Sequence, residues 1–127
     1  MAVLGISSYL ANAWLNTVRN VPFTVGQTCV QMHTGHPGDG TDDVGLGGAR
    51  QAAVFGAAAD GGIELTGGMP TWAVTGAETL THVSVWDAYE DGNLLWTAAL
   101  RIPRVVANGD TFTLNAADLG IVPLAVG

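Results

Sequence analysis

The chain has 127 residues, the length of a single domain, because a second hydrophobic core is expected only in considerably longer chains. Charged residues make up 12% of it, and 4 cations, all arginine, stand against 11 acids, which gives a net charge of −7. A chain this acidic lacks the cationic surface that DNA or RNA binding needs, so we expect no direct contact with nucleic acid.

The apolar share of the chain is high for one with so little charge. Hydrophobic residues make up 48%, the mean hydropathy is +0.32, and no stretch is long and apolar enough for a membrane span. Because interface cores are depleted in charge, this composition predicts that other subunits cover much of the surface. The N-terminus MAVLGISSYL has no secretory signal pattern, so we expect synthesis and folding in the cytoplasm and no membrane partner.

The first 20 residues are predicted to contain one helix. Apolar residues recur at steps of three and four between positions 6 and 19, and Ser7 or Ser8 can cap the N-terminus. The apolar stripe includes Leu10, Trp14 and Val18. This stripe can pack on the domain's own core or dock onto a neighbouring subunit.

Residues 21–127 show short β-branched or aromatic runs separated by Gly, Asn and Asp, which is typical of an antiparallel all-β domain. We therefore predict a mainly β fold, an antiparallel, jelly-roll-like β-sandwich that forms one domain with the N-terminal helix. The predicted strands are Thr28–His33, Ala49–Phe55, Ile63–Leu65, Thr71–Val74, Thr79–Asp87, Leu94–Ile102, Thr111–Leu114 and Ile121–Val126.

Two turns are predicted to close hairpins. Asp91-Gly92 joins the strands before and after it, and Asn108-Gly109-Asp110 joins residues 104–106 to residues 111–114. The residues around Trp96 are apolar, so we expect this side chain in the core. The only cysteine, Cys29, excludes an intramolecular disulfide, and we expect it to be a small buried hydrophobic residue.

Residues 34–48 form a predicted loop of 15 residues, six of them glycine, and loops of this length tend to be functional. His33, His36, Asp39, Asp42 and Asp43 are possible metal ligands, but their spacing matches no EF-hand or zinc motif. We therefore expect a contact loop with no metal and no other cofactor.

No catalytic motif is present, so we expect no enzyme. No serine lies in a G-x-S-x-G turn, and His82 and Ser84, two residues apart on one strand, are about 7 Å apart and best interpreted as a satisfied polar pair. The nearby acids Asp87, Glu90 and Asp91 crowd a single turn, which is no separated pair for glycoside hydrolysis.

Several blocks in this order resemble a family of small tailed-bacteriophage virion proteins, tail-fibre or minor structural proteins, from Ser8 to about Leu119. The resemblance implies a structural component of the virion with a β-sandwich and no enzymatic role. Its blocks are Ser8-Tyr9-Leu10-Ala11-Asn12-Ala13, Val30-Gln31-Met32-His33-Thr34-Gly35-His36-Pro37-Gly38, Ala49-Arg50-Gln51-Ala52, Thr81-His82-Val83, Trp86-Asp87-Ala88, Gly92-Asn93-Leu94-Leu95-Trp96 and Asn108-Gly109-Asp110-Thr111-Phe112.

Our functional prediction is a non-catalytic capsid decoration or minor capsid protein, because the chain has no coiled-coil heptads or repeats that would form a fibre shaft. The alternative is a tail-fibre or tail-tip component that binds host-surface glycan through Trp72 or Tyr89. We expect a homo-oligomer that contacts the major capsid protein or tail proteins. The predicted interface residues are Leu10, Trp14, Val18, His36, Asp42, Asp43 and Trp72.

Overall fold

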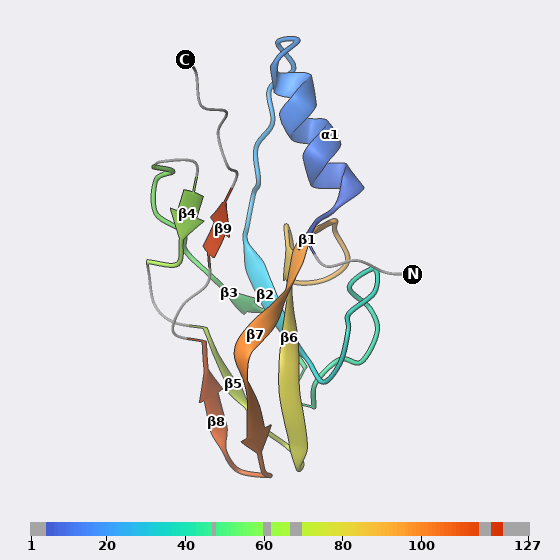
Figure 1. Cartoon of the computed structure of the whole chain (residues 1–127), viewed down its shortest axis with the longest axis vertical. Helices are drawn as coiled ribbons and strands as arrows, with labels where there is room; N and C mark the ends of the chain where they lie inside the picture. The colour runs from blue at the N-terminus through green and yellow to red at the C-terminus, as the bar shows by residue number, and fades with distance from the viewer. Residues whose placement is uncertain (1–4, 47, 60–61, 67–69, 115–117, 121–127) are drawn as a thin grey trace.

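The structure is a computed structural model that describes residues 5–46, 48–59, 62–66, 70–114 and 118–120. It is mainly β with one helix, its sheets are antiparallel, and they form a sandwich-like arrangement, which confirms the predicted fold class (Figure 1). None of the helical segments described reaches the length and apolarity that crossing a bilayer requires.

The main sheet has five strands in the order β1-β7-β6-β2-β3. Two smaller sheets pair β4 with β9 and β5 with β8. The strands are β1 (Gly5–Ile6), β2 (Cys29–His33), β3 (Gln51–Ala52), β4 (Gly62–Glu64), β5 (Thr71–Ala73), β6 (Glu78–Trp86), β7 (Leu94–Val106), β8 (Thr111–Thr113) and β9 (Asp118–Gly120).

The hydrophobic core lies between the main sheet and the two smaller sheets. Val30 on β2 and Val85 on β6 are register partners, and both belong to one buried cluster with Trp72 of β5 and Phe112 of β8. Trp96 of β7 is 5% exposed in the same cluster, and the ring of Phe55 packs edge-on against it with centroids 5.5 Å apart. The predicted burial of Trp96 is confirmed.

The opposite face of the main sheet is also covered, because residues 34–46 fold over it. Side chains alternate along a strand, so Ser84 and Trp86 of β6 point away from the core, yet both are buried. Cys29 on the neighbouring strand is also fully buried, as predicted. A central strand covered on both sides needs no polar face, and β6 accordingly has buried side chains on both of its faces.

The predicted helix is confirmed as α1 (Ser8–Thr17), shorter at both ends than the apolar stripe suggested. Ser7 is the N-cap: its Oγ accepts the Leu10 N–H at 3.1 Å and donates to the Leu94 carbonyl at 2.5 Å. The second bond ties the start of α1 to β7. At the other end Asn20 takes a left-handed conformation (φ 69°), which ends the helical path.

The first predicted hairpin is confirmed and the second is wrong. Asp91 (φ 52°) and Gly92 (φ 72°) turn the chain between β6 and β7, which pair along their length. A turn also forms around Gly109 (φ 93°), but β8 pairs with β5, and the last residues of β7 pair with β6. The reason is that the Val74 N–H donates to the Asp110 carbonyl, which holds this turn against the end of β5.

Other boundaries differ in ways that follow from tertiary pairing. The strand predicted at residues 49–55 shortens to β3, while β7 continues beyond the predicted Ile102 to Val106. Pro103 is tolerated there because it lies in the irregular part of β7, where the pairing with β6 is interrupted between residues 99 and 104. The short strands β1 and β9 were not predicted, and the strand predicted at residues 121–126 lies outside the described residues.

Candidate interaction surface

The helical part of the predicted interface divides into a buried and an exposed half. Leu10 is 2% exposed and Trp14 packs against the core, so this part of the stripe serves the chain's own fold. The prediction that the Leu10 side chain lies in an interface is therefore corrected. Val18 is 84% exposed just after α1, and Leu15 is 69% exposed beside it, so the C-terminal end of the helix offers an apolar surface.

Trp72 is not a surface aromatic residue, which corrects its placement in the interface and in a glycan site. It is 3% exposed, its indole N–H donates to the Ala49 carbonyl at 2.7 Å, and its ring packs near that of Phe112. The alternation of Trp72 with exposed Thr71 and Ala73 on β5 is the sequence feature that could have predicted its burial.

Residues 34–46 pack as a closed loop on the second face of the main sheet. The Thr34 N–H donates to the Asp43 carbonyl and the Gly45 N–H to the Met32 carbonyl. Gly40 lies so close to the Trp86 ring that an added Cβ would contact it at 2.5 Å. The loop therefore has a fixed shape, which leaves the Asp42 and Asp43 side chains exposed and His36 partly buried.

A buried polar network lies beneath this loop. The His33 Nδ1 is 2.7 Å from the Asp42 carbonyl oxygen, and its Nε2 is 2.6 Å from the Ser84 Oγ, which also accepts the Trp86 indole N–H at 2.8 Å. Because a carbonyl only accepts, Nδ1 carries the proton and the Ser84 hydroxyl donates to Nε2. Ser84 is thus satisfied by His33 and Trp86, which corrects its predicted pairing with His82.

This serine and histidine have no access to a substrate, because both side chains are 0% exposed. Burial lowers the pKa of His33 below the ordinary 6.5, although its bond to the Asp42 carbonyl opposes the shift. Burial, and then the neighbouring His36 ring at 5.8 Å, also lower the pKa of His82. Burial thus favours the neutral form of the His33 imidazole, and the network acts as structural support for the loop.

Two further charged side chains fix this face. The Glu78 carboxylate accepts the Leu46 N–H, with both oxygens at 2.9 Å. The Arg50 Nη1 donates to the carbonyls of Ala88 (2.9 Å) and Asp91 (2.7 Å), and its guanidinium lies 3.8 Å from the centroid of the Trp86 ring. Within the residues described, no group of three His, Cys, Asp or Glu side chains is placed to hold a metal ion.

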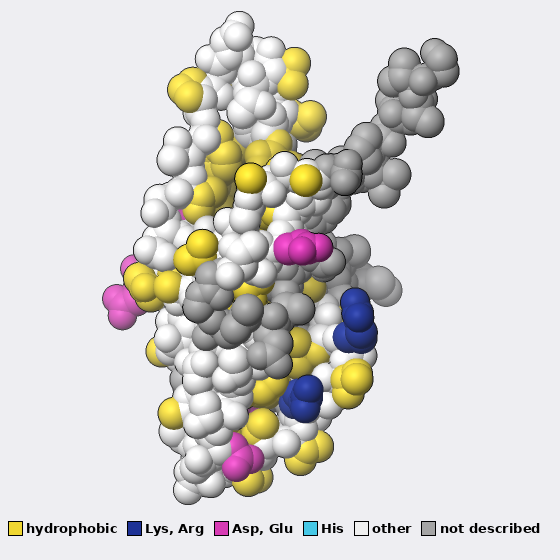
Figure 2. All heavy atoms as spheres, turned by 90° about the vertical axis from the view of Figure 1, so that its left-hand side faces the viewer, with side chains coloured by type: hydrophobic (Ala, Val, Ile, Leu, Met, Phe, Trp, Pro, Cys, Tyr) yellow, Lys and Arg dark blue, Asp and Glu magenta, His cyan; other side chains and the backbone are white. Residues whose placement is uncertain are grey.

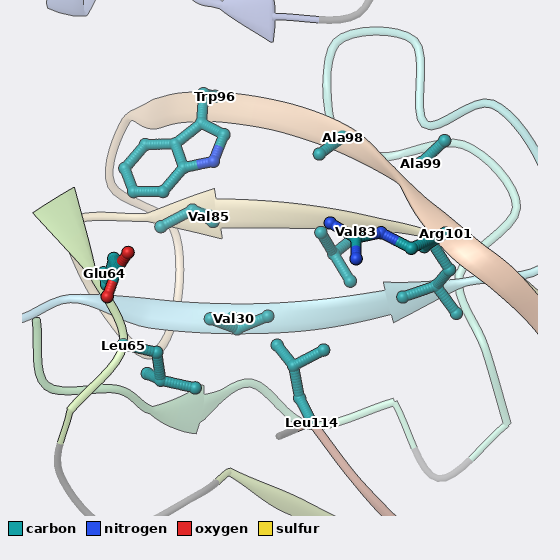
Figure 3. Close-up of a pocket in the computed structure, with 11 residues that line it drawn as sticks. Val30, Glu64, Leu65, Val83, Val85, Trp96, Ala98, Ala99, Arg101 and Leu114 are labelled. Carbon is teal, nitrogen blue, oxygen red and sulfur yellow. The ribbon is translucent and has the colours of Figure 1, made fainter. Parts of the chain in front are cut away.

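A cavity of about 730 Å³ opens between the main sheet and the smaller sheets (Figure 3). Val30, Val83 and Val85 line its sheet side, and Leu65 and Leu114 face them. Glu64 is the one carboxylate among its described lining residues, and the other charged group, Arg101, extends from β7. A lining of this kind offers apolar contact and no pair of groups for acid and base catalysis.

The comparison with known families identifies the chain. A family model described as Podophage GP4 fiber I protein gp80 matches residues 5–122. The chain belongs to this family. The gp80 match covers the helix and every strand described above, and it makes the protein a structural component of a tailed-phage virion, as the sequence resemblance implied. A structural fibre family is also consistent with a non-enzymatic role. No curated protein matches the chain.

Proposed function

We propose that this gp80-family chain is a component of a virion fibre and not a capsid decoration protein. The observation that carries the proposal is the match to a family described as a fibre protein across residues 5–122. The absence of coiled-coil heptads from the sequence favoured a location on the capsid. A fibre, however, also contains compact segments between or beyond its shafts. A β-sandwich with an exposed helix end is suited to such a segment.

We also propose that the chain forms one domain and acts as a homo-oligomer joined to other virion proteins. The helix and strands from all three sheets contribute to one buried cluster, which supports a single folding unit. Leu15, Val18 and Val21 leave apolar side chains exposed at the end of α1, in a chain with little charge to keep monomers apart.

Particles assembled without this chain test the fibre location. We expect DNA-filled heads of normal stability that adsorb poorly to host cells, with adsorption restored when the chain is supplied in trans. Heads that lose DNA while adsorption stays normal would support the capsid location and contradict the fibre proposal.

Tyr89 supports a second candidate function, binding of host-surface glycan by the same fibre component. Its side chain is 53% exposed in a cleft of about 490 Å³ that is also lined by Gln31, Arg50, Glu90 and Asp91. An aromatic face beside amide, guanidinium and carboxylate groups can stack on a sugar ring and bond its hydroxyls. We expect Tyr89→Ala to reduce binding to host cell-wall polysaccharide and Tyr89→Phe to keep it. Unchanged binding by Tyr89→Ala would contradict this role.

A further inference from the structure

The outer edge of β7 is open over most of its length. β1 pairs with β7 only at Trp96 and Thr97, so among the described residues the stretch 98–106 pairs with β6 alone, at residues 98–99 and 104–106. The pairing with β6 is also irregular, because Leu80 faces Arg104 while His82 faces Ala99. The three extra residues on β7 push this part of the strand outward.

We define the basic edge as Arg101, Ile102, Arg104 and Val105, all exposed on this stretch. Ile102 is 66% and Val105 is 84% exposed, and no described residue forms an ion pair with either arginine. Figure 2 shows arginine side chains beside exposed hydrophobic side chains on this face of the molecule. Among the described residues, two of the four cations of a chain with net charge −7 thus have no carboxylate partner.

The complementary surface lies on the loop that covers the second face of the main sheet. We define the acidic loop as residues 39–46, in which Asp39, Asp42 and Asp43 are exposed. Val44 (40%) and Leu46 (52%) expose apolar side chains on the same loop. The loop is bridged to β2, and its Leu46 N–H bonds to Glu78 of β6, so the acidic loop lies over β2 and β6, whereas the basic edge lies along β7 (Figure 1).

We propose that the basic edge of one copy binds the acidic loop of the next copy. Each surface combines charges of one sign with two exposed apolar side chains, so the two surfaces match in both respects. Because one surface lies over a face of the sheet and the other along the edge of β7, each copy can use both at once, which makes the contact head-to-tail and allows a closed ring. The inference rests on the homo-oligomer in the proposed function and names the surfaces that form it.

The contact we propose is formed by side chains and does not extend the sheet. Pro103 in the middle of the basic edge has no N–H, and the outward displacement of residues 100–103 breaks the regular spacing that a new strand would need. Pairing of ions at a partly exposed contact is screened by salt, so the association should weaken as ionic strength rises.

Charge reversal on the full chain tests the proposal, with the assembly state measured by sedimentation and light scattering. One variant carries Arg101→Glu and Arg104→Glu, and the other carries Asp39→Lys and Asp42→Lys. Asp43 is left unchanged because its left-handed conformation (φ 49°) favours Asp over Lys. We expect each variant alone to dissociate, with a dissociation constant raised about 100-fold, and a mixture of the two to associate again.

The control carries Thr24→Glu and Gln27→Glu at exposed positions outside both surfaces; it changes the net charge by −2, as Arg101→Gln with Arg104→Gln does, and should leave assembly unchanged. Circular dichroism and thermal melting check that each variant is folded. A milder variant, Arg101→Gln with Arg104→Gln, should also weaken assembly. A parent chain that is monomeric at low salt would overturn both the inference and the proposed homo-oligomer. A parent that assembles regardless of these reversals, or variants that fail to associate when mixed, would overturn the inference alone.

Discussion

His33 is the residue at which the acidic loop and the main sheet are joined most closely. Its ring bonds to the Asp42 carbonyl on the loop and to Ser84 on β6, and its backbone is bridged to Val44. The sequence places His33 beside several acids, which indicated a ligand set or a contact residue. Only the register of β2 against β6 brings it to Ser84, 51 positions away, so this network could not be predicted from spacing.

Acidification should therefore destabilise the fold through His33. Because burial makes its pKa lower in the folded than in the unfolded chain, the unfolded chain binds more protons below about pH 6.5. Stability is then full above this pH and falls as the pH drops below it, and the lowered pKa of His82 acts in the same direction. Melting temperature measured from pH 7.5 to 5.5 checks this.

His33→Gln is the comparison variant, since it removes the titrating group from the network. Its melting temperature should be lower at pH 7.5 but should depend less on pH than that of the parent. Parallel pH profiles for the two proteins would show that another group causes the loss.

We expect the buried Trp96 side chain to contribute strongly to the free energy of unfolding. Trp96→Ala should cost about 3–5 kcal/mol of unfolding free energy, because it removes a buried indole and leaves a cavity beside Phe55. Urea unfolding measures the loss. Tyr89→Ala, at a half-exposed position, should cost less than about 0.5 kcal/mol. A Trp96→Ala protein as stable as the parent would contradict the assignment of this residue to the core.

At the scale of elements, sequence patterns predicted those parts that local chemistry determines. The helix with its Ser7 cap, the alternating central strand and the turn at Asp91-Gly92 all have local causes. The pairing of β8 with β5 has no such local cause, because the turn at Gly109 is compatible with pairing to either β5 or β7. The contact between Trp72 and Phe112 selects β5, and only the folded core supplies that contact.

The turn between β6 and β7 should be sensitive to a single methyl group. Gly92 has φ 72°, and a Cβ there would contact the Asp87 carboxylate, which accepts the Asn93 N–H at 2.7 Å. We expect Gly92→Ala to lower the unfolding free energy by more than about 1 kcal/mol. Gly26→Ala, where a Cβ meets no atom within 4 Å, should change it by less than about 0.5 kcal/mol. Equal effects of the two substitutions would refute this account of the turn.

The acidic loop should keep its shape without a metal ion. Its described anchors are hydrogen bonds to His33, Met32 and Glu78, so a chelator should leave the melting temperature of the chain unchanged. A metal ion present at 100 times its dissociation constant would instead add about 2.7 kcal/mol to the free energy of unfolding, and chelation would remove this contribution. A fall of several degrees on addition of EDTA would therefore contradict a loop built by protein contacts alone.

At the scale of the whole molecule, composition indicated assembly but not its place in the particle. Sparse charge and exposed apolar side chains suit a subunit that is covered by others, whether in a capsid or in a fibre. The sequence resemblance predicted a virion structural protein, which the family match confirms. The separation of opposite charges, with Asp42 over a face of the main sheet and Arg104 along the edge of β7, became visible only when strand order was known.

The location of the chain on the particle tests the central claim most directly. A small peptide tag can be inserted at Asn108-Gly109, an exposed turn where a Cβ on Gly109 meets no atom within 4 Å, and labelled with gold on purified virions. Electron microscopy should then show gold on the fibres at the tail, in a small and constant number for each particle. Gold distributed over the capsid surface would contradict the fibre assignment.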